Sequence, residues 1–411
     1  MKNISKYLEQ YAEQHIVECG TRLVNYLTLL LTDSITKPLT FEHVVVIPAY
    51  KESPDFIERL LSSPLIEQNV LFIIVINQPD SDEDNNLQQS LADFIKNSGN
   101  SEFKHESLEL ISTNKSSSFL IIDAFTQPLA VDHGVGLARK IGSDLALLLK
   151  SENIIKSEWI HSTDADSHLP NDYFLATQSL NQTKNISAVS YNFTHVSDDL
   201  DIHTANSLYE TALRYYVKGL TFAGSQYNFF TIGSVIAFKA KDYAMVRGFP
   251  KRSAGEDFYL LNKLAKLGKV EFLKDTLVKI DARTSDRVPF GTGPSVANIL
   301  QLKINNQAYC YYHPQIFAEL KTCLVHFNSL WEHRLIFESW LSELSTETQQ
   351  ALLEAKLDGF VSKQKNNNQT QFNKQLHVWF DAFKTLKFIH SLREQKYADI
   401  PLEQSIELAK F

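Results

Sequence analysis

The chain has few of the residues that mark several whole classes of protein. Its three cysteines, at positions 19, 310 and 323, are scattered, odd in number and without metal-ligand spacing. They are typical of buried or incidental thiols in a reducing compartment. Aspartate and glutamate (48) outnumber lysine and arginine (40), so the net charge is −8 and nothing indicates binding to nucleic acid. The apolar run at Leu27–Leu31 is far shorter than a membrane span.

The beginning of the chain also lacks the apolar region of a signal peptide, because Met1–Lys6 leads into polar residues. With 44% hydrophobic and 21% charged residues, the composition is that of an ordinary globular protein, and 411 residues allow two domains or one large domain with extensions. We therefore expect a cytoplasmic protein without a membrane span. Peripheral contact with a membrane surface is compatible with this expectation.

Strand and helix patterns alternate through the first half of the chain. Predicted strands lie at 43–48, 70–76, 118–122 and 158–163, and predicted helices at 53–62, 85–97 and 135–150. This order predicts βαβ units and a parallel sheet, whose ligands bind outside the carboxyl ends of the strands. Helical spacing is also present in residues 1–35 and, almost without interruption, beyond residue 298.

Two carboxylates, Asp164 and Asp166, stand one residue apart where the strand at 158–163 ends. In an extended strand, residues i and i+2 point the same way, so both side chains should project toward one spot. Oxygen donors of this kind suit Mg²⁺ or Mn²⁺. The alternative is a pair of solvated turn residues.

Three other segments carry motifs in a fixed order with this D-x-D. They are the strand His43–Glu52 (HVVVIPAYKE), the helix start Gly134–Arg139 (GVGLAR) and the Glu256-Asp257 pair before an amphipathic helix. Together the four motifs resemble the family 2 glycosyltransferases with the GT-A fold, over roughly residues 42–290. The resemblance implies an α/β fold with a Rossmann-like, mostly parallel central sheet. Expected domains are an N-terminal helical extension (1–40), the GT-A domain (41–297) and a C-terminal helical region (298–411).

The resemblance also implies residues that bind the nucleotide-sugar donor. The loop after the first strand would hold base and ribose through Pro48, Ala49, Tyr50 and Glu52. The second strand departs from the family's D-D-G-S ending, because Asn77-Gln78-Pro79-Asp80 stands there instead. Asn77 could bond a base edge and Asp80 could replace the missing carboxylate. A UDP-sugar is the favoured donor and a GDP-sugar the alternative.

At about 100° of rotation per residue, Arg139 is predicted about 200° round its helix from Leu137, off the buried stripe, where it could reach a phosphate, lock the D-x-D loop or be solvated. Asp166 is the better candidate for binding Mn²⁺ or Mg²⁺ directly. Asp164 could bind either the metal ion or the ribose of the donor. His161 and His168 are further candidates for the metal shell, or packing residues.

Glu256 and Asp257 begin a predicted helix at 256–267. Asp257 could simply cap that helix. A carboxylate at a helix N-terminus also stays ionised and could accept the proton of an acceptor hydroxyl. We therefore expect Asp257 to be the catalytic base and Glu256 to orient the acceptor or the base.

Residues 283–294 contain two glycines and two prolines around one Phe, together with Arg283 and Arg287. The segment could fold over a diphosphate as a lid, or simply connect two regions. The Q-x-x-R-W signature of processive family members is absent.

The sequence thus predicts a metal-dependent glycosyltransferase that moves a sugar from a nucleotide-sugar donor to an acceptor hydroxyl, the acceptor being unknown, and the resemblance implies inversion at the anomeric carbon. The alternatives are a nucleotidyltransferase of sugar phosphates and a non-catalytic nucleotide-sugar-binding scaffold.

Overall fold

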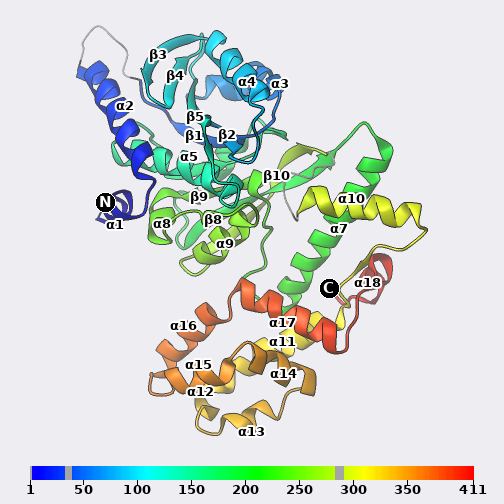
Figure 1. Ribbon diagram of the computed structural model, residues 1–411. Helices are drawn as coiled ribbons and strands as arrows, with labels where there is room; N and C mark the ends of the chain where they lie inside the picture. The colour runs from blue at the N-terminus through cyan, green and yellow to red at the C-terminus, as the bar shows by residue number, and fades with distance from the viewer. Residues whose placement is uncertain (1, 33–38, 283–290) are drawn as a thin grey trace. The chain divides into compact units, whose positions relative to one another are not determined.

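The computed structural model describes residues 2–32, 39–282 and 291–411 (Figure 1). Its contacts divide the chain into two compact units. The first consists of Met1–Ser197 and Thr231–Gly291, and the second of Asp198–Phe230 and Thr292–Phe411. Residues 198–230, which the sequence assigned to the α/β domain, therefore belong with the C-terminal helices, and the second unit resumes at Thr292 rather than at 298.

The first unit is built on one sheet of ten strands, counted over the described part of the chain, in the order β3-β4-β5-β2-β1-β6-β9-β8-β10-β7. The strands are β1 (His43–Ala49), β2 (Val70–Pro79), β3 (Asn100–His105), β4 (Leu108–Ser112), β5 (Ser118–Leu129), β6 (Trp159–Ser162), β7 (Ser167–His168), β8 (Ile186–Val196), β9 (Ile236–Lys239) and β10 (Lys269–Asp281). Strands β5, β2, β1 and β6 are parallel neighbours, as are β8 and β10, while β9 runs antiparallel between β6 and β8.

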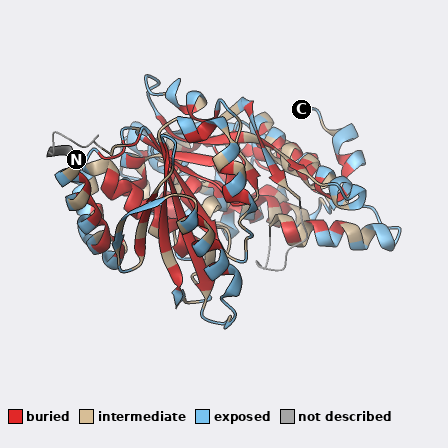
Figure 2. Ribbon diagram, turned by 90° about the horizontal axis from the view of Figure 1, so that it is seen from above, coloured by how far each residue is buried: buried red, intermediate tan, exposed pale blue. Residues whose placement is uncertain are grey.

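The predicted α/β class with a mostly parallel sheet is confirmed. All seven residues of β1 are buried, which is the pattern of a strand covered on both faces. Figure 2 shows the same burial across the centre of the sheet. The sequence analysis missed the β3–β4 hairpin, whose first strand is largely exposed and polar, and it predicted no strand at β8.

Helices flank the sheet. In the first unit they are α1 (Lys2–Gln10), α2 (Gln14–Thr32), α3 (Asp55–Ser62), α4 (Asn86–Asn97), α5 (Gly134–Ser151), α6 (Tyr173–Gln178), α8 (Ala240–Met245) and α9 (Glu256–Leu264), with 3₁₀ turns η1 (Pro64–Glu67) and η2 (Gly233–Val235). Of these, α1, α2, α3, α4, α5 and α9 lie where helices were predicted, whereas α6 and α8 were not predicted. Helix α5 packs on β1 and β2 and is itself covered by α1 and α2, so it is buried on nearly every side.

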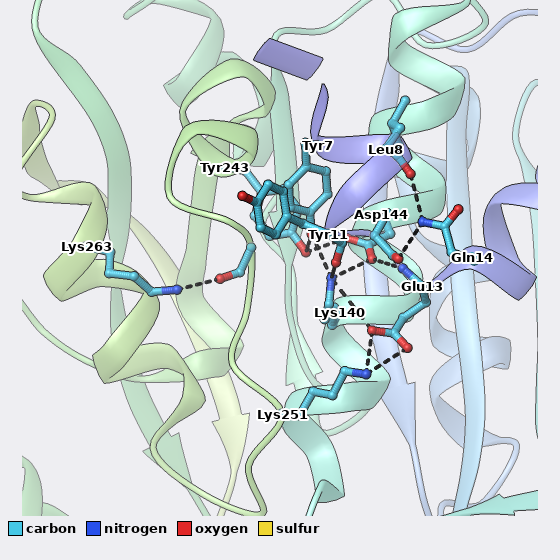
Figure 3. Close-up of polar contacts among 12 residues, drawn as sticks. Tyr7, Leu8, Tyr11, Glu13, Gln14, Lys140, Asp144, Tyr243, Lys251 and Lys263 are labelled. Atoms are coloured by element: carbon cyan, nitrogen blue, oxygen red, sulfur yellow. Dashed lines mark hydrogen bonds and ion pairs between the residues drawn. The ribbon is translucent and has the colours of Figure 1, made fainter. Parts of the chain in front are cut away.

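A buried polar network joins α1 to α5 and α8 (Figure 3). The Tyr7 hydroxyl donates to Asp144 Oδ1 (2.6 Å) and accepts from Lys140 Nζ (2.8 Å). Lys140 Nζ also donates to Asp144 Oδ2 (2.8 Å), and the Tyr243 hydroxyl donates to Oδ1 (2.9 Å). All four side chains are buried. Buried charges persist only when they are paired and hydrogen-bonded, so this network fixes how α1 sits on α5.

The second unit is helical. It contains α7 (Leu200–Ala223), α10 (Thr292–Ile304), α11 (Gln315–His326), η3 (Phe327–Ser329), α12 (Leu330–His333), α13 (Phe337–Leu341), α14 (Thr346–Glu354), α15 (Leu357–Gln364), α16 (Gln369–Trp379), α17 (Ala382–Gln395), α18 (Leu402–Leu408) and the short antiparallel pair β11 (Cys310–Tyr311) and β12 (Ile400–Pro401). Helix α7 belongs here because Tyr215 and Leu220 enter the same core as Phe317 and Trp340.

Over the described residues, we find no helix whose length and hydropathy would let it cross a membrane. The three cysteines are free thiols, of which Cys19 and Cys323 are buried and Cys310 is exposed.

Replacing Tyr7 by Phe should lower the free energy of unfolding by about 1.5–3 kcal/mol, the usual effect of removing a hydrogen bond to a charged group. The loss arises because Asp144 loses a donor and Lys140 an acceptor in a buried place. The control is Tyr11→Phe, because Tyr11 enters the network through its backbone oxygen. Urea unfolding of the two variants measures the difference, and equal midpoints would mean that the network adds no stability.

Candidate active site

The D-x-D motif lies in a tight turn rather than in an extended strand. Strand β6 ends at Ser162, and the Ser167 N–H donates to the Asp164 carbonyl (3.1 Å). The expectation that strand alternation aligns Asp164 and Asp166 is therefore wrong, because both residues lie beyond the last strand residue. The turn is held from outside, since Arg59 Nη2 donates to the Ala165 carbonyl (2.6 Å) and the Asp281 N–H to the Asp166 carbonyl (2.9 Å).

Arg139 is the buried centre of the site. It is 2% exposed, which corrects the prediction that it lies away from the buried part of its helix. Its Nη2 lies 2.6 Å from Asp164 Oδ1 and its Nε 2.9 Å from Glu256 Oε1. Nη1 donates to Ser162 Oγ (2.8 Å). Burial opposes its charge, but Asp164 and Glu256 outweigh burial and raise the pKa of Arg139 above its usual value. Three roles were predicted for Arg139: binding a phosphate, locking the D-x-D loop, or facing solvent. These contacts fit the second role.

Glycines bring the start of α5 close enough for Arg139 to reach both acidic motifs. The Gly136 N–H donates to the Arg252 carbonyl (2.9 Å), and a Cβ on Gly136 would lie 2.5 Å from the Pro250 carbonyl oxygen. Gly233 faces the guanidinium itself, because a Cβ there would lie 2.5 Å from Arg139 Nη2. These positions need glycine for close backbone approach rather than for an unusual backbone angle.

Glu256 and Asp257 open α9 but differ in environment. Glu256 is buried and bonded to Arg139, whereas Asp257 is half-buried and accepts the Phe258 N–H through Oδ1 (2.6 Å). The N-cap position of the helix is Gly255, in the left-handed region at φ 72°, so Asp257 is not the N-cap residue, although it satisfies one N–H of the first turn. Burial and the neighbouring Glu256 charge raise the pKa of Asp257 to about 7. This contradicts the expectation of a low pKa, since desolvation and a like charge outweigh the helix terminus.

The loop after β1 is anchored to the loop after β2. Pro48 and Ala49 are buried at the strand end. The Tyr50 hydroxyl donates to Asp82 Oδ2 (2.7 Å), and Lys51 Nζ lies 3.0 Å from the same oxygen. Glu52 is half-buried. The sequence analysis did not identify Asp82 as a site residue, although Asp82 lies only two residues after Asp80.

Asn77 and Asp80 occupy different settings at the end of β2. Asn77 is 7% exposed and its Oδ1 is buried with no hydrogen-bond partner among the described residues. Asp80 is exposed, and its Oδ1 accepts the Val131 N–H (3.0 Å), which ties its loop to the segment after β5. Since β1, β2, β5 and β6 are parallel, both residues lie at the same sheet edge as Tyr50 and Asp164.

The two candidate histidines have other partners. His161 is fully buried, with Nδ1 3.1 Å from the Val44 carbonyl and Nε2 3.2 Å from Thr177 Oγ1. Burial lowers its pKa to about 3, and with both nitrogens engaged it is not a metal ligand. His168 Nε2 lies 2.7 Å from Asp281 Oδ1. Arg283 and Arg287 of the predicted lid lie outside the described residues.

No protein-family model matches the chain, and no curated protein is significantly similar to it. Among solved structures, it is similar to S. aureus TarS 1-349 in complex with UDP-GlcNAc, at 11% identity and a TM-score of 0.38, over 87% of this chain and 93% of that one. It is also similar to the mannosyltransferase PcManGT from Pyrobaculum calidifontis in complex with GDP-Man and Mn²⁺, at 14% identity and a TM-score of 0.38, over 93% and 97%. At such TM-scores neither likeness assigns a function or a site residue.

The fit of Gly233 against Arg139 predicts the effect of a single methyl group. Gly233→Ala should lower the free energy of unfolding by about 1–3 kcal/mol, the range for overpacking, because the ion-paired guanidinium cannot move aside. The matched control is Gly359→Ala in α15, where a Cβ meets open space and the better helix former should leave stability unchanged or raise it. Thermal unfolding of both variants tests this, and a neutral Gly233→Ala would show that Arg139 can shift freely.

Proposed function

We propose that this chain is a nucleotide-sugar-dependent glycosyltransferase with a GT-A-type catalytic domain. The observation that carries the proposal is that one buried guanidinium, Arg139, binds a carboxylate of the D-x-D motif and a carboxylate of the Glu256-Asp257 pair. Three motifs that the sequence separates by up to 117 positions thus meet at one point. They meet at the carboxyl end of a parallel sheet, which is where such sheets bind their ligands.

The donor's diphosphate and a divalent metal ion would lie at the D-x-D turn. Asp164 contacts Arg139 through Oδ1 and its side chain remains 34% exposed, so it can still face a ligand. Together with the half-buried Asp166 it offers only carboxylate oxygens, a donor set that fits Mg²⁺ or Mn²⁺. When bound, such an ion would supply positive charge for the departing nucleoside diphosphate.

The nucleoside would lie along the loops after β1 and β2. The Tyr50 ring is held by its hydroxyl bond to Asp82, and Tyr50 and Asn77 lie at the carboxyl ends of parallel strands, at the same sheet edge. An amide can both donate to and accept from a base edge. Asp80, in contrast, is exposed and already bonded to the Val131 N–H, so we assign it to holding the loop in place.

Asp257 is the proposed general base. A carboxylate whose pKa is about 7 accepts a proton near neutral pH far better than one with an ordinary low pKa. It would take the proton of the acceptor hydroxyl as that oxygen attacks the sugar, which gives inversion if the displacement is a single step. Glu256 is buried and bonded to Arg139, so we assign it to positioning rather than to catalysis.

The two alternative functions fit the site less well. A nucleotidyltransferase would need a basic, glycine-rich loop after the first strand, but here Pro48 and Ala49 are buried and Lys51 is paired with Asp82. A non-catalytic scaffold is less favoured, because a carboxyl whose pKa is raised by burial and a neighbouring acid, as that of Asp257 is, is found most often in catalytic sites.

The donor class can be tested without knowing the acceptor. With Mn²⁺ present, the full chain should slowly hydrolyse a UDP-sugar or a GDP-sugar, and a chelator or Asp166→Ala should abolish the hydrolysis. Asp93→Ala, an exposed carboxylate on α4, serves as the control that should behave like the unaltered chain. Binding without hydrolysis would favour the scaffold, and hydrolysis that survives Asp166→Ala would remove that residue from metal binding.

The base can be tested by pH. Below about pH 7, Asp257 is protonated and cannot accept a proton, so kcat/KM should rise about tenfold per pH unit up to pH 7 and then level off. Asp257→Asn should lower turnover by roughly 10²–10⁴-fold and remove this rise. Stability at neutral pH should not fall, because an amide oxygen can still accept the Phe258 N–H and the neutral amide removes a charge that burial and Glu256 disfavour. A variant that keeps the pH profile would exclude Asp257 as the base.

A further inference from the structure

A second group of metal-binding side chains lies between α2 and the β3–β4 hairpin. It consists of His15, Cys19 and Glu106, whose ligand atoms all lie within 4.8 Å of one another. Cys19 Sγ is 3.8 Å from His15 Nε2 and 3.3 Å from Glu106 Oε2, and His15 Nδ1 is 3.7 Å from the same oxygen. A further imidazole lies nearby, since His105 Nε2 is 3.8 Å from the other carboxylate oxygen of Glu106, Oε1.

The fold brings these donors together from two elements, helix α2 and the connection of the β3–β4 hairpin. His15 and Cys19 are four residues apart on α2, so they lie on one face of the helix. Glu106 occupies the two-residue connection of the β3–β4 hairpin at φ 47°, a left-handed conformation that turns its side chain toward that face. The hairpin and the helix also pack directly, with the Tyr26 and Phe103 rings 5.4 Å apart.

The two separations measured from Cys19 Sγ are close to those around a tetrahedral ion. Bonds of about 2.0 Å to nitrogen or oxygen and about 2.3 Å to sulfur, meeting at a tetrahedral angle, place neighbouring ligand atoms about 3.3–3.5 Å apart. The Cys19 Sγ to Glu106 Oε2 distance (3.3 Å) and the Cys19 Sγ to His15 Nε2 distance (3.8 Å) are within a few tenths of an ångström of this spacing. One ligand atom of each residue lies within 4.8 Å of the other two, so side-chain rotations would close the set around an ion.

We propose that His15, Cys19 and Glu106 form a binding site for a transition-metal ion of the Zn²⁺ class, with His105 or a water as the fourth ligand. A thiolate and an imidazole select such an ion over Mg²⁺ or Mn²⁺, which prefer oxygen ligands alone. The site is therefore chemically distinct from the carboxylate pair Asp164 and Asp166. On binding, the Cys19 thiol loses its proton to solvent and the sulfur donates to the ion.

The exposure of the three side chains fits a site that an ion can enter from solvent. The His15 and Glu106 side chains are 63% and 57% exposed, whereas Cys19 lies buried beneath them at 1%. An ion can reach the site, and the thiolate is then shielded. The ion would join α2 to the β3–β4 edge of the sheet. Its binding should therefore stabilise the packing of the N-terminal helices against that sheet.

Cobalt(II) is a direct probe, because a thiolate ligand gives it an intense charge-transfer absorption that oxygen and nitrogen ligands do not. The untagged full chain, stripped with chelator, should show this band, saturate at one Co²⁺ per chain and lose the band when Zn²⁺ is added. Excess Mg²⁺ should not displace it. Cys19→Ser should abolish the band, whereas Cys310→Ser, at an exposed thiol of the second unit, should keep it.

Two exposed variants guard against misfolding of a buried-cysteine variant. His15→Gln and Glu106→Gln should each weaken Co²⁺ binding at least tenfold while leaving the circular dichroism spectrum unchanged. Absence of a thiolate band in the unaltered chain would overturn the proposal, as would a band that survives in Cys19→Ser. Neither result depends on glycosyl transfer, so the site and the proposed activity can fail separately.

Discussion

The candidate site depends on the burial of one guanidinium. Arg139 is surrounded by Asp164, Glu256 and the Ser162 hydroxyl, each at hydrogen-bond distance. Loss of this cation would leave a buried carboxylate unpaired, and breaking a buried ion pair in this way typically costs about 3–5 kcal/mol. The pairing also links α5, the turn after β6 and the start of α9. The geometry of both acidic motifs therefore follows from where α5 places a single side chain.

The same helix carries a second polar network on consecutive residues. Arg139 faces the acidic motifs, while Lys140 faces Tyr7 and Asp144 beneath the N-terminal helices. Adjacent residues on a helix point about 100° apart, so two buried cations can serve two networks only if the helix is covered on both sides. Helix α5 meets that condition because β1 and β2 lie on one side and α1 and α2 on another. The N-terminal helices thus support the element that organises the site.

Periodicity and motif spacing predicted much of this arrangement. Strands β1, β2, β5 and β6 were found because buried β-branched runs are distinctive, and the four motifs do lie at one sheet edge. Helical spacing could not predict that Arg139 is buried, because it assumes that only one face of a helix packs against the protein. Helix α5 is packed on several faces. The raised pKa of Asp257 depends on Glu256 and on desolvation in the folded chain. The partner of Cys19 is 87 residues away at the tip of a hairpin whose polar first strand escaped detection, which is why its spacing looked uninformative.

The contrast between Glu256 and Asp257 shows how one arginine can give neighbouring carboxylates different properties. Glu256 is bonded to the guanidinium at 2.9 Å and is nearly inaccessible, so its charge is balanced. Asp257 lies in the same desolvated region and feels the Glu256 charge, with only a backbone N–H and the more distant cation to offset it. Two acids side by side cannot both be stabilised by one cation to the same degree. The acid that is left with less compensation is also the more accessible one, and that is the position from which a proton can be accepted from a bound molecule.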